Sequence, residues 1–334
     1  MEPAALRGGG HLARSYKRKR KMYYKYSDYL KEKYDEKVYK IPVNLPVSCP
    51  NRDGTCGQGG CIYCGGSGAD FEMLSPSLSV SEQLAKNIAY IGPKYKARKF
   101  IAYFQNYSNT YLPPENFQSA LDEAAQHRGI VGLTVSTRPD CISDAYLNIA
   151  REIQETYPID LVVEMGLQTA NYKTLSLMNR GHTLAEFIDA VLRVKAFHLQ
   201  AGAHVMLGLP WDTEEDVRET AKILSALQVD NVKLHALYIL RNTQLADWYR
   251  NKNFTLKTKE QFVEEAILFL RYLSPDIPVQ RLLGRAPEEE TVFCNWGNSW
   301  RKIHDEIVDR MTEKNIKQGD LCDYLGGKAV RRFL

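Results

Sequence analysis

The chain has 334 residues, of which 44% are hydrophobic and 25% charged, and its formal net charge is +4. This composition is that of an ordinary folded protein and excludes an intrinsically disordered chain, and no apolar run reaches the roughly 18 residues of a membrane span. A chain of this length can form one α/β barrel around one core. Because the first residues lack the apolar stretch of a secretory signal, we expect a cytoplasmic protein with no membrane partner.

Residues 1–37 are predicted to form a basic, tyrosine-rich extension at the N-terminus. Residues 1–40 hold twelve Lys and Arg against five Asp and Glu, and the block KRKRK at 17–21 runs into YYKYSDYLKEKY. Basic side chains interleaved with tyrosines suit a phosphate backbone and unstacked bases, so the pattern favours contact with RNA. A solvated basic helix or a frayed arm explains the same pattern.

Four cysteines lie within CPNRDGTCGQGGCIYC, residues 49–64. Cytosolic thiols stay reduced, and clustered ones are more often metal ligands or redox groups than disulfides. Cys49, Cys61 and Cys64 have the spacing C-x11-C-x2-C, and three thiolates on a [4Fe–4S] cluster would leave one iron open to a substrate or cofactor. With Cys56 as a fourth ligand, zinc also stays possible on counting alone.

Short apolar runs alternate with amphipathic helical stretches through the middle of the chain. This rhythm predicts a parallel sheet, and right-handed connections would wrap six strands into a complete or partial (β/α) barrel. The fold class is therefore α/β, with the barrel core at 38–254 and a C-terminal helical extension at 255–334 packed on it. The predicted strands are residues 38–45, 99–105, 129–137, 160–169, 202–210 and 231–240.

Unusual polar residues follow the predicted strands, at the end of a parallel barrel where chemistry gathers. Arg138 in STRPD could bind a carboxylate with its guanidinium, or pair with Asp140 at a helix start. Glu164 and Gln168 lie an even number of residues apart on one strand, so they are expected to face the same way. A carboxylate in so apolar a strand needs partners, which makes Glu164 a candidate ligand-binding residue.

A cysteine loop after the first strand of such a barrel resembles the radical S-adenosylmethionine (SAM) superfamily, although the common spacing there is C-x3-C-x2-C. The ordered segments CPNRDGT, GGCIYC, YFQNYSNTY, GLTVSTRPDC, VEMGLQT, NRGHT and HVMLGLPWDT cover nearly the whole chain. They are similar to those of the family typified by YtqA and YhcC, which is related to the radical SAM part of the Elongator catalytic subunit. The resemblance implies the partial six-strand barrel of the superfamily.

The resemblance also implies the cofactors and their ligands. Cys49, Cys61 and Cys64 correspond to the ligands of a [4Fe–4S] cluster whose open iron binds SAM, while Cys56 falls outside the pattern. Arg138 corresponds to a position that faces SAM, and Glu164 is a candidate for its ribose or ammonium group. The other predicted SAM-binding residues are Asn106, Ser136 and Gln168. Asn106 stands where the superfamily often has a Gly-Gly-Glu segment.

For function, the resemblance implies tRNA as the substrate and a one-electron donor such as flavodoxin or ferredoxin. The implied reaction converts 5-carboxymethylaminomethyl-(2-thio)uridine at the wobble position to its 5-aminomethyl form. Two alternatives remain: a radical SAM enzyme that acts on a small molecule or a protein, and a non-catalytic, zinc-bound nucleic-acid-binding module that uses all four clustered cysteines.

Overall fold

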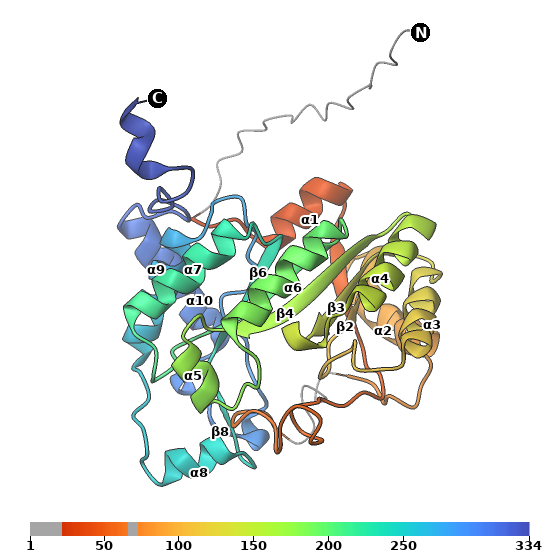
Figure 1. Ribbon diagram of the computed structural model, residues 1–334, viewed down its shortest axis with the longest axis horizontal. Helices are drawn as coiled ribbons and strands as arrows, with labels where there is room; N and C mark the ends of the chain where they lie inside the picture. The colour runs from red at the N-terminus through yellow and green to blue at the C-terminus, as the bar shows by residue number, and fades with distance from the viewer. Residues whose placement is uncertain (1–21, 66–72, 334) are drawn as a thin grey trace.

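A parallel sheet forms the centre of the computed structural model, which describes residues 22–65 and 73–333 (Figure 1). In this part of the chain the sheet has six strands, each paired with the next one in sequence, and the first and last do not pair with each other. The sheet therefore curls into an open half-barrel, which confirms the predicted partial barrel. The strands are β1 (Val38–Val43), β2 (Lys99–Phe104), β3 (Ile130–Thr137), β4 (Asp160–Gln168), β5 (Gln200–Leu207) and β6 (Asn231–Ala236).

Alternation along the strands separates an apolar outer face from a polar inner face. On β4, Leu161, Val163 and Met165 belong to the main hydrophobic core, whereas Glu164 points to the other face. The outer face is covered by five amphipathic helices, and burial of their apolar sides against it is the main stabilising contribution. These helices are α2 (Val80–Tyr95), α3 (Pro114–Ala125), α4 (Asp144–Thr156), α6 (Leu184–Ala196) and α7 (Glu214–Ala226).

Helix α1 (Tyr26–Tyr34) lies across the end of the barrel at which the strands begin (Figure 1). Its Tyr26 and Leu30 side chains are buried against Val38 and Ile101 from β1 and β2. At the same end the Tyr34 hydroxyl donates a hydrogen bond to Asp160, the first residue of β4. These contacts make the tyrosine-rich segment part of the barrel's packing, while the KRKRK block at 17–21 lies outside the described residues.

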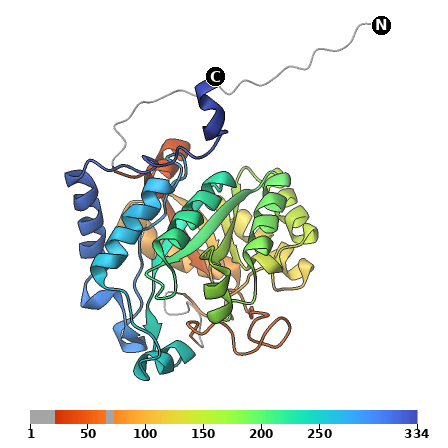
Figure 2. The ribbon, with the colours of Figure 1, turned by 60° about the vertical axis from the view of Figure 1, so that its left-hand side comes forward.

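The C-terminal part packs beside the barrel and completes its interior. Helix α9 (Lys259–Tyr272) packs on α7, and α10 (Trp300–Glu313) packs on α9 (Figure 2). In the stretch of chain that connects these two helices, residues 278–281 run along the free edge of β6. There Gln280 N donates to Val232 O at 2.8 Å, and Leu234 N donates to Arg281 O at 3.0 Å. This edge pairing brings Gln280 and Arg281 to the barrel. None of the helices in the described ranges has both the length and the apolar character needed to cross a membrane.

The strand predicted at 231–240 is shorter than expected. β6 ends at Ala236, and Ile239–Leu240 form β7, which pairs antiparallel with β8 (Thr291–Phe293). The chain turns away because Leu237 and Ile239 are buried in a second hydrophobic cluster, together with Ile62 of the cysteine loop. Helices α5 (Tyr172–Leu177) and α8 (Gln244–Arg250) supply further residues of this cluster.

Candidate functional site

The cysteine loop follows β1 and lies at the opposite end of the strands from α1 (Figure 1). Buried Ile62 anchors it, because its N–H donates to Met178 O at 3.1 Å and its carbonyl accepts from Leu245 N at 2.9 Å. A tight turn brings the close pair together, with Cys64 N donating to Cys61 O at 3.0 Å. Cys61 is buried, Cys49 is half-buried and Cys64 is exposed; all seven cysteines are free thiols. The loop therefore holds its cysteines available for ligation.

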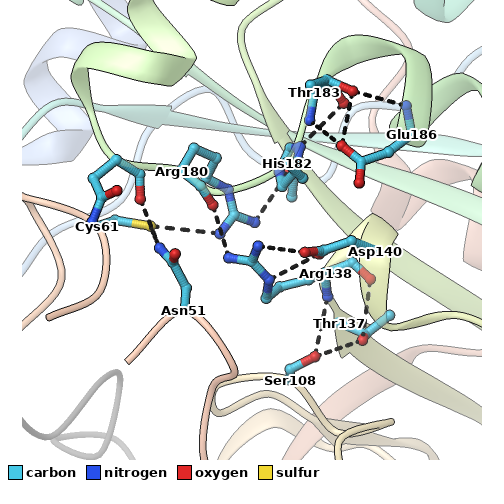
Figure 3. A network of polar contacts seen from close by, with 12 residues as sticks. Asn51, Cys61, Ser108, Thr137, Arg138, Asp140, Arg180, His182, Thr183 and Glu186 are labelled. Carbon is cyan, nitrogen blue, oxygen red and sulfur yellow. Dashed lines mark hydrogen bonds and ion pairs between the residues drawn. The ribbon is translucent and has the colours of Figure 1, made fainter. Parts of the chain in front are cut away.

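The Cys61 sulfur accepts two side-chain hydrogen bonds (Figure 3). Arg180 Nη1 lies 3.6 Å from Cys61 Sγ, and Asn51 Nδ2 lies 3.7 Å from the same atom. Interaction with the Cys64 thiol, together with the neighbouring Arg180 guanidinium, holds the pKa of Cys61 well below its usual range. Donors and positive charge directed at a sulfur stabilise a thiolate, the form that ligates metal.

Glycine at position 166 allows Arg180 to reach the barrel end. Arg180 Nη2 donates to Gly166 O at 3.0 Å, and a Cβ added at Gly166 would lie 2.6 Å from both Arg180 Nη2 and Gln168 Nε2. His182 Nε2 also bonds Gly166 O, at 2.8 Å. Near this point β4 carries a bulge, and Gln168 has φ +75°, so simple strand alternation does not continue from Glu164 to Gln168. Alternation alone therefore does not settle how Gln168 is directed, and the expectation that it faces the same way as Glu164 stays a prediction.

Arg138 is buried, and its guanidinium donates three hydrogen bonds to protein groups. Its Nε and Nη2 donate to the two carboxylate oxygens of Asp140, at 2.9 and 2.6 Å, and its Nη1 donates to Arg180 O at 2.8 Å (Figure 3). The sequence offered two partners for Arg138, a ligand carboxylate or Asp140, and the structure shows the pair with Asp140. Contact between Arg138 and SAM stays a prediction. The bond from Arg138 holds the backbone carbonyl of Arg180. It thereby helps to position the Arg180 guanidinium, which donates to Cys61.

Inside the half-barrel, Glu164 is the centre of a buried network. Lys40 donates to it from β1, His204 Nε2 from β5 at 2.8 Å, and Gln280 Nε2 at 2.5 Å. Burial alone would raise the pKa of Glu164, but Lys40, the bond from His204 and the charge of Lys233 hold that pKa well below its usual range. Glu164 is therefore an ionised carboxylate with no surface exposed.

Further polar side chains extend this network around the inner face. Lys233 Nζ donates to the Tyr103 hydroxyl at 2.7 Å, and Tyr103 in turn lies 3.1 Å from Ser136 Oγ. On the next inward position of β6, His235 Nδ1 accepts from Arg281 Nη2 at 3.0 Å. We call this set the interior layer; it consists of Lys40, Tyr103, Ser136, Glu164, His204, Asn231, Lys233, His235, Gln280 and Arg281.

The predicted SAM-binding residues thus fall into separate groups. Ser136 and Glu164 are register partners on adjacent strands of the interior layer. Arg138 and Gln168 lie nearer the cysteine loop, beside Arg180 and Gly166. Asn106 is buried after β2, where its Nδ2 donates to Asn44 Oδ1 at 3.3 Å. Their contacts with SAM remain predictions.

Sequence reasoning missed several residues of the site. Lys40 and Lys233 are charged residues in apolar strands, the same signal that drew attention to Glu164. Arg180 lies in the quoted NRGHT segment, but nothing in the segment connects it with Cys61. Gln280 and Arg281 lie outside any regular element, and no sequence signal placed them beside β6.

The loop fits an iron–sulfur cluster in its chemistry. Three cysteines with free thiols share one anchored loop, and one of them already accepts two N–H donors, the kind of outer contact that tunes a thiolate-bound cluster. Within residues 22–65 and 73–333, no three His, Cys, Asp or Glu side chains, the three cysteines included, converge closely enough to hold a metal ion.

Comparison with known proteins identifies the family. The profile of the Radical SAM superfamily matches residues 49–224, more than half of the chain, and that of the Radical_SAM C-terminal domain matches residues 229–313. The uncharacterized protein YtqA of Bacillus subtilis (strain 168) is 31% identical over 302 residues, which cover 88% of this chain and 92% of YtqA.

Two further similarities are more distant. The tRNA uridine(34) acetyltransferase of Methanocaldococcus jannaschii is 29% identical over 161 residues, which cover 47% of this chain and 28% of that protein. The solved structure of archaeal Methanocaldococcus infernus Elp3 with an N-terminal deletion shares the fold, with a TM-score of 0.64 at 17% identity; the match covers 84% of this chain and spans 64% of that one. From the matched profile and the similarity to YtqA along most of its length, the chain belongs to the radical SAM superfamily.

Proposed function

We propose that this protein modifies wobble uridine in tRNA by radical SAM chemistry, converting 5-carboxymethylaminomethyl-(2-thio)uridine to the 5-aminomethyl form. The observation that carries the tRNA part is the similarity to a tRNA uridine(34) acetyltransferase, which covers 47% of this chain. The reaction itself is the one implied by the resemblance to the YtqA and YhcC family.

Radical SAM enzymes use a [4Fe–4S] cluster and SAM, which together supply a 5′-deoxyadenosyl radical that removes a hydrogen atom from the substrate. In this chain Cys49, Cys61 and Cys64 would hold the cluster. Arg180 and Asn51 would keep donating to the Cys61 sulfur, and Arg138 would hold Arg180 in place through its backbone carbonyl. The cofactors supply the reactivity, and these residues supply binding and orientation.

The substrate conversion balances as a two-electron oxidation followed by hydrolysis. The amine–methylene bond of the carboxymethylamino group loses a hydrogen atom, an electron and a proton to become an imine, with SAM as the oxidant, reduced to methionine and 5′-deoxyadenosine. Water then cleaves the imine, leaving the aminomethyl group on the base and releasing the two-carbon unit as glyoxylate.

The proposal is tested in cells that lack the protein. Nucleoside mass spectrometry of their tRNA should show the carboxymethylaminomethyl nucleoside accumulating at position 34 while the aminomethyl nucleoside disappears. A gene carrying Cys61→Ala should not restore the profile, whereas Cys56→Ala, which changes an exposed cysteine of the same loop, should restore it. An unchanged nucleoside profile in the deleted cells would remove this substrate.

A further inference from the structure

The interior layer carries more positive charge than its carboxylate neutralises. Lys40 forms an ion pair with the carboxylate of Glu164, although burial lowers the pKa of Lys40. The Arg281 guanidinium, which donates to the His235 ring, adds a positive charge beyond that pair. Charges taken out of water are costly unless an opposite charge comes close, so the layer favours binding of an anion.

The neighbouring histidines do not reduce this excess. Burial and the charge of Lys233 lower the pKa of His204 to about 4. Burial and the Arg281 guanidinium lower the pKa of His235 well below its usual range. Both rings are therefore neutral at physiological pH, and they offer N–H groups without requiring a counter-ion of their own.

Buried donors without an acceptor lie beside the cations. In the described part of the chain, Arg281 Nε, His235 Nε2 and Asn231 Nδ2 are buried atoms with no hydrogen-bond partner. Because His235 Nδ1 accepts from Arg281, the proton of the neutral ring is on Nε2, so all three atoms are donors. Buried polar groups are normally satisfied, and three unsatisfied donors call for acceptor atoms from a ligand.

The layer is accessible to such a ligand. Lys40 and His204 keep 18% and 17% of their side-chain surface accessible, and Arg281 and His235 are only half-buried. Helix α1 closes the barrel on one side of the layer, whereas the cysteine loop lies at the opposite end of the strands (Figure 1). The interior layer lies on the strands between these two ends.

We propose that the interior layer binds the carboxylate of the substrate's side chain, with Arg281, Lys233 and His235 as the binding residues. The inference rests on the proposed function, since the carboxymethylaminomethyl side chain ends in a carboxylate. Ammonium and guanidinium groups form strong, charge-assisted hydrogen bonds to carboxylate oxygens. The aminomethyl product has lost this carboxylate and carries an amine instead, so the same layer distinguishes substrate from product.

Binding without turnover tests this site on the wild-type protein. The protein, reconstituted anaerobically with its cluster and supplied with SAM but no reductant, is titrated with two synthetic anticodon stem-loops. One carries 5-carboxymethylaminomethyluridine at the wobble position and the other the neutral amide of the same side chain. We expect the carboxylate RNA to bind at least about tenfold more tightly, as a charge-assisted hydrogen bond implies. Equal affinities, or no binding of either RNA, would overturn the proposal.

Variants locate the preference in the interior layer. Arg281→Met should abolish most of the difference between the two RNAs, while Arg281→Lys, which keeps the charge, should retain part of it. Arg301→Met, at an exposed position of α10, is the matched control and should leave the difference unchanged. Uridine 5′-monophosphate is a third probe: Arg281-dependent binding of this phosphate, with no preference between the two RNAs, would make the layer a phosphate site and refute the carboxylate assignment.

The two proposals fail separately. A carboxylate preference that depends on Arg281, in a protein whose deletion leaves cellular tRNA unchanged, would support the anion site and remove the proposed reaction. A changed tRNA profile together with equal binding of carboxylate and amide would support the reaction and overturn the anion site.

Discussion

Arg180 shows how one side chain connects the cysteine loop with the barrel. Its guanidinium donates both to Cys61 Sγ, at 3.6 Å, and to Gly166 O, at 3.0 Å, and its carbonyl accepts from Arg138. Such outer contacts orient ligands and tune the electronic properties of a metal centre. A positive charge near a cluster stabilises its reduced state more than its oxidised state, because reduction adds negative charge.

The Arg180→Met variant tests this contact. Loss of the positive charge and the hydrogen bond should lower the midpoint potential of the reconstituted cluster, on the order of 50 mV, since one hydrogen bond to a charged group is removed. Potentiometric titration followed by electron paramagnetic resonance measures the shift. Arg180→Lys should retain most of the wild-type potential, and an unchanged potential in Arg180→Met would show that Arg180 does not act on the cluster.

His204 makes stability depend on pH in a defined direction. Its pKa is about 4 in the folded protein, because of burial and the charge of Lys233, against an ordinary value of 6.5. Between these values the unfolded chain binds the extra proton, so the stability of the fold should rise with pH from about 4 to 6.5. Lys40, Glu164 and His235 are the other titratable groups near the ring.

His204→Gln isolates this contribution, since the glutamine amide can still donate to Glu164 but does not titrate. Urea unfolding of the cluster-free protein at pH 5 and pH 7 should show a smaller difference for the variant, by about 2 kcal/mol. An equal pH dependence in wild type and His204→Gln would contradict the assignment.

At the scale of elements, the start of helix α6 helps to position the residues that contact Gly166. Helix α6 begins with a capping box, in which the Thr183 hydroxyl accepts from Glu186 N and the Glu186 side chain accepts from Thr183 N. Directly before it, Arg180 and His182 both bond Gly166 O. The cap therefore fixes the point at which the chain leaves the site and enters the helix.

Thr183→Ala removes the cap without touching the cysteines. The free energy of unfolding should fall by about 1 kcal/mol, the usual effect of losing an N-cap hydroxyl. Chemical denaturation of the cluster-free protein measures it. Thr156→Ala, which removes an exposed hydroxyl bonded to Glu152 O in the last turn of α4, is the control with a smaller expected effect. Equal losses in both variants would mean that the capping box is not important.

At the scale of the whole molecule, the sequence predicts the barrel better than its interior. Short apolar runs separated by amphipathic helical stretches are sufficient to predict the six parallel strands, because each strand buries apolar side chains that the local sequence shows. The apolar pattern predicts a longer last strand than the structure has, because Leu237 and Ile239 continue the pattern but are buried in the cluster around Ile62. Only the tertiary structure separates the two cores.

The sequence predicts some residues of the interior layer but not the contacts between them. Glu164 was identified because a carboxylate in an apolar strand needs partners, but its partners come from β1, β5 and an irregular segment more than one hundred residues away. Likewise, Arg138 and Arg180 lie in recognisable segments, yet their hydrogen bond is a product of the fold. Residue types and spacing therefore locate the site, and long-range packing determines its charge and donor arrangement.

The products formed in vitro test the proposed reaction. The anaerobically reconstituted protein is incubated with SAM, a reductant and tRNA that carries 5-carboxymethylaminomethyluridine, and the products are quantified by mass spectrometry. We expect equal amounts of 5-aminomethyluridine, 5′-deoxyadenosine and glyoxylate from the wild-type protein. The Cys61→Ala variant should form none of these products. Formation of 5′-deoxyadenosine while the nucleoside stays unchanged would contradict the claim.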